Sequence, residues 1–389
     1  MTDLASTELL DVIRAQAAEA DQTRSVANDV LQAIRASELM RLSASANIGG
    51  SAASIVRIGD ELRQVAAACT STAWCLWNHL CTFHLFCGLL GPANQAFLRG
   101  VVERAEWVCF PAGASTAVQG EVLSNTQSPQ LALTGKAAFG SGARYADWAG
   151  VSFVLADAEG PQFSMIDLHQ DGVQIDADWF AMSLRASATD TVCYDGGSVP
   201  SERVVPFPFR YREVFRDAQR AMIDHRYRED WVALSDLWLG WMAAGLAQQA
   251  LDEVCTGIKD RIAIMGVKVA QRPTVHVNLG AAQAAISAAQ DTVRVACEET
   301  DARISAQILP TEDDYLRQLA ASMQALALCD EAFRLLLRVM GGNGLREGGD
   351  FERRYRDFQA MPLHINAHRD RVTEQYGRQL LGLPTENPF

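Results

Sequence analysis

Two histidines in this 389-residue chain stand where an imidazole could handle protons. His364 follows Pro362 at the expected start of the last helix, and His79 ends an apolar run that begins at Trp74. A histidine titrates near neutral pH, so it can accept or donate a proton during a reaction. His364 could instead cap the helix or fill the core, and His79 could be a buried histidine satisfied by hydrogen bonds. Each histidine is therefore a candidate for catalysis, and each could instead have a purely structural role.

The histidines and cysteines do not predict a metal site. His368 lies four residues after His364, so both imidazoles would share one helix face, but an intervening Glu and a third ligand are not evident. Four of the nine cysteines, from Cys69 to Cys87, recur every six residues, which turns successive thiols about 120° apart on a helix. No Cys-x-x-Cys pair occurs. We expect free, mostly buried thiols in a reducing compartment, and no bound metal.

Charge and hydropathy limit the partners of the chain. It carries 34 Lys and Arg against 47 Asp and Glu, a net charge of −13, whereas nucleic-acid interfaces and anionic membranes require a basic face. No apolar run reaches the roughly 18 residues of a spanning helix, and residues 1–10 do not resemble a signal peptide. These features predict a soluble cytoplasmic protein with no nucleic-acid or membrane partner. A neutral or cationic small substrate remains compatible with the charge.

Three compositional zones must position the candidate side chains. Residues 1–108 are rich in Ala and Leu with helical periodicity. Residues 109–215 contain short β-branched runs between turns and leave no room for helices between strands, so a small antiparallel barrel or sandwich is expected. Residues 216–389 return to long helices that suit an antiparallel four-helix bundle, often oligomeric. The long helices are expected at 230–256, 274–307, 311–340 and 362–381.

Five short motifs follow one another along these zones. They are Asp21–Arg24 with Asn47–Gly50, Leu133–Gly142, Ser198–Val204, Gly341–Gly344, and Arg353–Asp357. Each motif alone is weak, but their order is specific. In that order they resemble the acyl-CoA dehydrogenase superfamily over essentially the whole chain. The resemblance implies an α+β fold with an N-terminal helical domain, a central β-domain and a C-terminal four-helix bundle, assembled as a homotetramer.

The position of the dehydrogenase base departs from that family. Removing a proton α to a thioester requires a carboxylate beside the flavin, and in the family this base usually follows the Arg-Asp pair. Counting the same distance from Asp357 arrives at His364-Ile365-Asn366. Some members keep the base on the first long C-terminal helix, where Asp236 is the nearest acid. A histidine at the base position resembles the family's other branch, the two-component flavin-dependent monooxygenases.

That branch implies a cofactor, a partner and roles for several residues. Reduced flavin (FMN or FAD) would come from a separate NAD(P)H–flavin reductase and react with O2 to form a C4a-hydroperoxide. His364 and His79 would handle protons, and a carboxylate at the place of His364 would destabilise a peroxide anion as it forms. Ser141 and Gly142 would reach the N5 or C4 carbonyl edge of the flavin, although they could also form an ordinary turn.

Other flavin contacts implied by the resemblance each have a structural alternative. Trp148 would flank the isoalloxazine or pack the barrel. Arg185 lies in a segment that approaches the flavin in the family, although Ala186 replaces the family's glycine. Gly342 and Gly344 would meet the flavin tail of a neighbouring subunit, or would only permit a bend between two helices.

The implied function is oxygenation of a small organic substrate. Trp74, Trp77 and His84 would line the substrate pocket, although a tryptophan pair at helical spacing is more often core. The substrate could be an aromatic or heteroaromatic carbon, an amine nitrogen as in amino sugars, or a sulfur. An acyl-CoA dehydrogenase with a displaced base is one alternative. A flavin-free binding or assembly protein of the same fold is the other.

Overall fold

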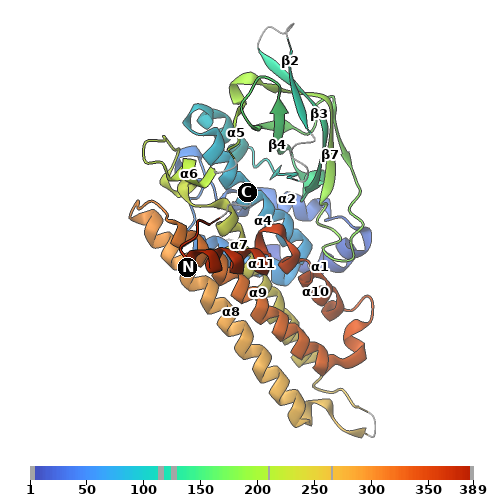
Figure 1. Ribbon diagram of the computed structural model, residues 1–389. Helices are drawn as coiled ribbons and strands as arrows, with labels where there is room; N and C mark the ends of the chain where they lie inside the picture. Colours follow the sequence, from blue (N-terminus) through green and yellow to red (C-terminus); the bar gives the residue numbers. More distant parts are fainter. Residues whose placement is uncertain (1–4, 113–117, 124–128, 209–210, 264–265, 386–389) are drawn as a thin grey trace.

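The first third of the chain is helical and contributes one element that is buried throughout (Figure 1). The computed structural model describes residues 5–112, 118–123, 129–208, 211–263 and 266–385. The helices are α1 (Thr7–Thr23), α2 (Asn28–Ala36), α3 (Ile55–Ala68), α4 (Thr70–Leu90) and α5 (Gln95–Glu103). All 21 residues of α4 are buried, so this helix has no polar face and must lie inside the protein. Polar side chains on α4 therefore need partners within the protein or from a ligand.

The central region is a sheet with both parallel and antiparallel pairs. Its strands are β1 (Val108–Cys109), β2 (Gln119–Leu123), β3 (Gln130–Gly140), β4 (Trp148–Leu155), β5 (Gln162–Asp167), β6 (Val173–Asp176), β7 (Asp190–Pro200) and β8 (Val205–Pro206). The order is β6-β7-β3-β2-β4-β5-β8, and β1 pairs with β4. The β2–β4 and β1–β4 pairs are parallel. The sheet, expected to be antiparallel, thus also contains parallel pairs, and β3 rather than a helix returns the chain between the parallel strands β2 and β4.

The last part of the chain forms the long helices. They are α6 (Tyr211–Arg216), α7 (Trp231–Gly257), α8 (Pro273–Ser305), α9 (Glu312–Met340), α10 (Asp350–Phe358) and α11 (Arg369–Leu380). Asp230 caps α7 by accepting from two backbone N–H groups, and Thr311 begins α9 with a capping box. α7 packs against α3, α4, α8 and α9, so it joins the first helices to the bundle. Figure 1 shows α8 and α9 side by side along the length of the bundle.

The segment expected to be one helix over 362–381 is interrupted. Two short 3-10 turns, Met361–Leu363 and Ile365–Ala367, precede α11. His364 joins the two turns in an extended conformation, with φ −60° and ψ 134°. His364 and His368 therefore do not share a helix face, and the His368 Nε2–H donates instead to the carbonyl of Leu363 at 2.9 Å.

Cysteine and membrane predictions can be compared with the structure directly. No disulfide forms, and all nine cysteines except Cys193 and Cys255 are buried. Burial raises the pKa of Cys87 to about 12, so this thiol stays protonated. Within the described ranges, no helix combines the length and hydrophobicity needed to cross a bilayer.

Candidate active site

His364 lies against two tryptophans of α4. Its ring centroid is 5.6 Å from that of Trp74 and 5.0 Å from that of Trp77, and both contacts are edge-on. The two indoles are 4.7 Å apart. Because α4 is buried along its length, the indoles form an apolar wall beside the imidazole. The structure thus brings together three predicted site residues that are almost 300 positions apart along the chain.

The imidazole of His364 is neutral and incompletely hydrogen-bonded. Burial lowers its pKa from 6.5 to about 4, and electrostatic interactions with His368 and Arg371 act in the same direction. The buried Nδ1 atom has no hydrogen-bond partner among the described residues. A buried nitrogen in this state is costly unless a ligand or water completes its hydrogen bonding. His364 is therefore placed to exchange a proton or a hydrogen bond with a bound molecule.

A cluster of hydroxyl groups accepts a hydrogen bond from Trp74. The Trp74 indole N–H donates to Ser141 Oγ at 3.0 Å, and Ser141 Oγ lies 3.0 Å from Thr189 Oγ1. Thr189 Oγ1 lies 2.7 Å from Ser187 Oγ. A hydroxyl accepts two hydrogen bonds and donates one. When Thr189 also donates to Ser141, the Ser141 proton is left to donate to a further acceptor.

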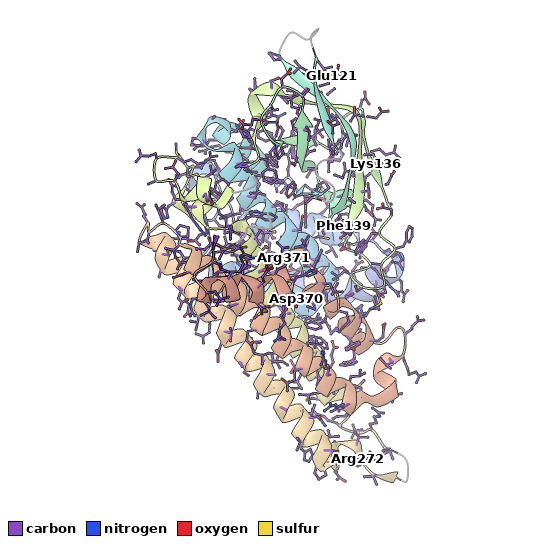
Figure 2. The ribbon with its side chains drawn as sticks, viewed as in Figure 1. Glu121, Lys136, Phe139, Arg272, Asp370 and Arg371 are labelled. Carbon is purple, nitrogen blue, oxygen red and sulfur yellow. The ribbon has the colours of Figure 1, made fainter. Side chains whose placement is uncertain are left out.

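The strand end that carries Ser141 also presents an aromatic side chain that sequence reasoning missed. Phe139 has φ +62°, a left-handed conformation that non-glycine residues rarely adopt, and its side chain is 64% exposed. Its ring is 6.5 Å from that of Trp179. Figure 2 shows Phe139 where the sheet meets the helices. The only sequence signal was an aromatic residue two positions before Ser141.

The segment 183–189 closes this region with unusual backbone conformations. Leu184 and Ala188 have φ +48° and +45°, and the N–H of Leu184 donates to the Asp357 carboxylate at 2.7 Å. Burial raises the pKa of Asp357 to about 6, against the Leu184 hydrogen bond and the Arg356 charge. The motif aspartate is therefore a positioning residue for this segment.

Asp236, considered above as a displaced base, lies on α7 directly after Ser235. It is fully buried, and neither carboxylate oxygen has a partner among the described residues. Burial raises its pKa well above the usual range for an aspartate, assisted by Asp230 and opposed by Arg371. The carbonyl of the preceding residue, Ser235, accepts a hydrogen bond from the indole N–H of Trp77 at 2.8 Å.

Comparisons with known proteins extend over the whole chain. Residues 237–369 match the acyl-CoA dehydrogenase C-terminal domain family. The chain is 23% identical to a pigment production hydroxylase of Rhodococcus sp. (strain ATCC 21145), and the match covers all of both proteins. It is 25% identical to HsaA, the oxygenase subunit of a flavin-dependent monooxygenase of Rhodococcus jostii (strain RHA1), with 97% of each covered. It is 24% identical to the oxygenase component of an FADH(2)-dependent resorcinol hydroxylase of Rhizobium sp. (strain MTP-10005), over 97% of this chain and 93% of that protein.

Solved structures give the same answer for the fold. XiaF from Streptomyces sp., in complex with FADH2 and glycerol, matches with a TM-score of 0.86 at 21% identity, over 98% of this chain and 95% of XiaF. The chain has the acyl-CoA dehydrogenase-like fold. TdsC from Paenibacillus sp. A11-2, in complex with FMN and indole, matches with a TM-score of 0.82 at 19% identity over 98% of each chain. The resemblance inferred from five short motifs, and the α+β class, are therefore confirmed.

Within the acyl-CoA dehydrogenase-like fold, His79 does not have the position expected of a second catalytic histidine. Its Nδ1 accepts from the Val108 N–H at 3.0 Å, so its Nε2–H donates to the Met40 carbonyl at 3.0 Å. Burial lowers its pKa to about 4. Both ring nitrogens are used, so the geometry supports the structural alternative, a satisfied core histidine.

Two further residues, predicted to contact the substrate or the flavin, also make hydrogen bonds within the protein. His84, expected in the substrate pocket, is fully buried and donates through Nε2 to the Glu229 carbonyl at 3.1 Å. Trp148, expected beside the flavin, donates through its indole N–H to Glu106 at 2.9 Å and packs edge-on against Phe97 at 5.0 Å. These contacts of Trp148 thus favour the alternative that it packs within the β-domain.

The Arg185 side chain and the glycine turn have contacts other than the hydroxyl cluster. The Arg185 guanidinium is 3.6 Å from Asp21, and its Nε–H donates to the Met182 carbonyl at 3.3 Å, so its side chain is engaged elsewhere. A Cβ on Gly344 would lie 3.1 Å from the Phe351 ring, whereas Gly342 has open space around it. Figure 1 shows this turn projecting beyond α9, outside the region where α4 meets the sheet.

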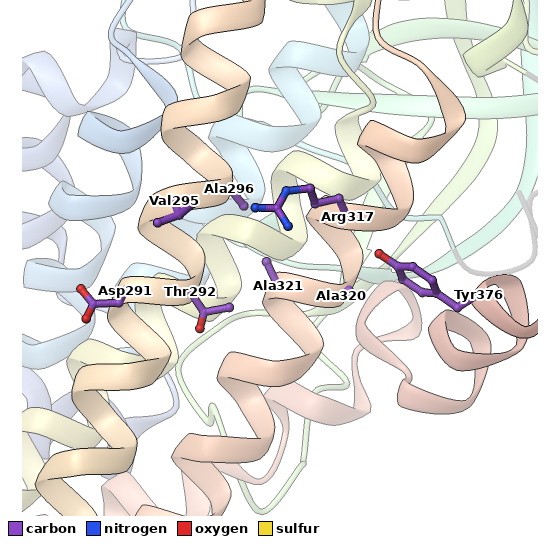
Figure 3. Close-up of a pocket in the computed structure, with 8 residues that line it drawn as sticks. All are labelled: Asp291, Thr292, Val295, Ala296, Arg317, Ala320, Ala321 and Tyr376. Carbon is purple, nitrogen blue, oxygen red and sulfur yellow. The ribbon is translucent and has the colours of Figure 1, made fainter. Parts of the chain in front are cut away.

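A separate hollow lies on the outside of the bundle. It has a volume of about 480 Å³ and lies between α8, α9 and α11 (Figure 3). Arg317 lines it but is already paired with Glu299, and Tyr376 faces it from α11. None of the predicted catalytic or cofactor-binding residues lines this hollow. The described residues also contain no cluster of three or more His, Cys, Asp or Glu placed to hold a metal ion.

The residues around Trp74 fit a flat ring system such as a flavin. The exposed Phe139 ring offers a stacking surface, and the Ser141 hydroxyl can donate to a ring nitrogen or carbonyl at the adjacent strand end. His364 contacts the same tryptophan edge-on, and its Nδ1 has no partner among the described residues. The arrangement can therefore hold an aromatic cofactor and a small substrate beside a neutral proton carrier.

Proposed function

We propose that the chain is the oxygenase component of a two-component flavin-dependent monooxygenase. It takes reduced FMN or FAD from a separate reductase and inserts one oxygen atom of O2 into a small aromatic or heteroaromatic substrate. The observation that carries the proposal is the neutral His364 with its unpartnered nitrogen in an apolar tryptophan wall. Relatives named as hydroxylases and monooxygenase subunits over nearly the full length support it.

The residues of the chain divide the work between the two sides of Trp74. The bound flavin supplies the oxygen-activating chemistry. On one side, the Ser141 hydroxyl, fixed by Trp74 and Thr189, donates to the flavin ring and orients it. On the other side, the Nδ1 atom of His364 holds or removes a proton at the substrate. Trp74 and Trp77 exclude water, which would otherwise divert the activated oxygen.

Several finer assignments belong to the same proposal. XiaF and TdsC were solved with FADH2 and FMN respectively, so either flavin is compatible. Gly342 and Gly344 serve the flavin tail of a neighbouring subunit, because their turn lies outside the site of its own subunit and leaves Gly342 open. We therefore include a homotetramer and a cytoplasmic location in the proposal, and assign no nucleic-acid or membrane partner.

The test follows the fate of molecular oxygen. Protein mixed with chemically reduced FMN or FAD, a phenol or indole substrate and ¹⁸O2 should yield a product carrying one ¹⁸O atom, with the second atom released as water. The unlabelled substrate and the mass of the product define the oxygenated position. Label incorporated from water instead of O2 contradicts the proposal.

The same preparation distinguishes the two alternatives. A dehydrogenase with Asp236 as base would hold oxidised flavin tightly, and adding an acyl-CoA thioester would bleach the flavin absorbance. A binding or assembly protein would bind neither oxidised nor reduced flavin at micromolar concentration. Either result would overturn the monooxygenase assignment.

A further inference from the structure

One face of α4 is turned toward the end of β3 and the segment 183–189. Its members have the i, i+3, i+4, i+7 spacing of residues that share one side of a helix: Ser71, Trp74, Cys75 and Asn78. Ser71 accepts a hydrogen bond from the Ala186 N–H at 3.4 Å, and the Cys75 thiol donates to the Ser187 carbonyl at 3.3 Å. Trp74 donates to Ser141. The first three members of this face are therefore all bonded to the strand end or to the segment.

Asn78, the fourth member, has a carboxamide without partners. It is 9% exposed, and its buried Oδ1 has no hydrogen-bond partner among the described residues. Within the same residues only its backbone is bonded, as when its carbonyl accepts from the Thr82 hydroxyl at 2.7 Å. By contrast, the similarly buried Asn94 donates from Nδ2 to the Leu90 carbonyl at 3.1 Å. A buried carboxamide without partners is costly unless a ligand or water completes its hydrogen bonds.

The part of α4 that can still be reached from outside the chain follows the same face. Ser71 and Trp74 are each 5% exposed and Asn78 is 9% exposed, whereas Leu76 and Leu80 on the opposite side are 0% exposed. Residues four apart on a helix lie about 6 Å from each other, and side chains lean toward the start of the helix. The Asn78 carboxamide therefore leans toward Trp74, whose indole also contacts His364. Asn78 is placed to contact a molecule that lies against Trp74.

We propose that Asn78 binds a neutral ring or ring substituent that presents an N–H and a C=O group on one edge, as in an imide, a lactam or a primary amide. A carboxamide carries an acceptor oxygen and an N–H donor side by side, so it pairs with such an edge through two hydrogen bonds. A single hydroxyl group cannot make both bonds at once. A neutral ligand fits because a charge would lose its hydration among these buried side chains.

Two molecules of the proposed function can supply this edge, and the inference rests on that function for both. The pyrimidine ring of a flavin has N3–H between two carbonyl groups, and Ser141, proposed to contact the flavin, is bonded to the tryptophan one turn before Asn78. An aromatic substrate with a lactam or primary amide group is the other source. The chemistry that Asn78 recognises is the same in both.

Two binding experiments distinguish the sources. In the first, the full chain is titrated with oxidised FMN and with 3-methyl-FMN, which lacks the N3–H donor, and flavin fluorescence is followed. In the second, calorimetry compares p-toluamide with its isomer N-methylbenzamide in the presence of excess oxidised FMN, which supports no turnover. N-methylbenzamide keeps one N–H, but on the edge opposite its carbonyl. The wild-type protein should prefer FMN in the first experiment or p-toluamide in the second by roughly tenfold.

Variants of α4 locate the preference. Asn78→Leu, of similar size, and Asn78→Ala, which leaves room for the added methyl group, should each reduce the ratio of affinities to about one. Thr82→Val is the matched control, because it removes a hydroxyl that bonds the Asn78 backbone and leaves the carboxamide in place. Its ratio should equal that of the wild type.

Stability in the absence of ligands gives a second measurement on the same variants. Asn78→Leu should unfold at the same or a higher urea concentration than the wild type, because no hydrogen bond of the side chain is lost. Asn94→Leu should unfold at a lower concentration, since it leaves the Leu90 carbonyl without its donor. A midpoint lowered as far in Asn78→Leu as in Asn94→Leu shows that Asn78 is structural and overturns the proposal.

The outcomes also separate this inference from the proposed function. Equal affinities in both experiments with the wild-type protein, or a preference that the Asn78 variants retain, overturn the binding role. Incorporation of ¹⁸O is measured in parallel. If oxygenation proceeds without either preference, only the role of Asn78 is lost. If a preference depends on Asn78 but no substrate is oxygenated, the monooxygenase assignment is lost and the binding residue remains.

Discussion

Two histidines of the same fold show that a lowered pKa alone does not identify the imidazole that is available to a ligand. His79 and His364 both have pKa values lowered to about 4 by burial, and both lie beside tryptophan rings. They differ in their hydrogen bonds. His79 uses both nitrogens to join α4 to two distant backbone groups, whereas Nδ1 of His364 has no partner among the described residues. A satisfied histidine stabilises the protein, and an unsatisfied one is available to a ligand.

Removing His364 should have the largest effect on activity. His364→Ala is expected to lower the rate of product formation by about 10²–10⁴-fold, the usual contribution of a positioned acid or base, while reduced-flavin binding survives. The free energy of unfolding at pH 7.5 should change little relative to that loss. Rapid mixing with reduced flavin and O2, followed by product analysis, measures the effect.

The control for His364 is His368→Ala, four positions along the chain. His368 is exposed and its ring donates to the Leu363 carbonyl, so its removal should leave the rate within a few fold of wild type. Unchanged product formation in the His364 variant would remove it from the catalytic residues.

Removing His79 should instead have the largest effect on stability. His79→Ala leaves the Met40 carbonyl and the Val108 N–H unpaired in the core and opens a cavity, so the free energy of unfolding should fall by about 3–5 kcal/mol. Denaturant unfolding measures this, with the exposed His276→Ala as control. A variant that is as stable as wild type yet inactive would show that His79 is catalytic after all, and would break the comparison.

Sequence reasoning recognised the fold, but it proposed both histidines as catalytic and could not separate them. Motif order and helix lengths are local properties, so they were readable from the chain. The partners of His79 are backbone groups at positions 40 and 108, and no local sequence pattern indicates such contacts. The contact of Arg185 with Asp21 was missed for a similar reason, because Asp21 lies in α1, far away along the chain. The left-handed backbone at Phe139 and the break around His364 depend on tertiary packing, which overrides local propensity.

Acid should affect the His364 region in a defined direction. The folded pKa of His364 is about 4 and its ordinary value is 6.5, so between these values the unfolded chain binds a proton that the folded chain does not. The free energy of unfolding therefore falls as the pH falls from 6.5 toward 4. At pH 5 this single group should cost about 2 kcal/mol relative to pH 7.5.

Replacing the imidazole sharpens this pH prediction. His364→Leu should lose less stability than wild type between pH 7.5 and pH 5 in urea unfolding. Asp236 works in the opposite sense, because its raised pKa means that the folded state holds a proton and gains stability on acidification. Equal pH dependence in wild type and His364→Leu would show that the imidazole is already solvated and does not have the environment described above.

The smallest expected effect concerns Phe139 at the end of β3. Its replacement tests whether this residue serves ligand binding rather than stability. Phe139 combines a left-handed backbone with an exposed aromatic ring, and both features are unfavourable in the protein alone. Phe139→Gly should therefore raise the free energy of unfolding by about 1 kcal/mol, because glycine adopts this conformation freely, whereas Phe139→Ala should not. If the ring stacks on the flavin, the glycine variant should bind reduced flavin more weakly despite its greater stability. A variant that gains stability and keeps its flavin affinity would show that Phe139 is strained without a binding role, and would leave Trp74 and Ser141 as the only contacts proposed on that side.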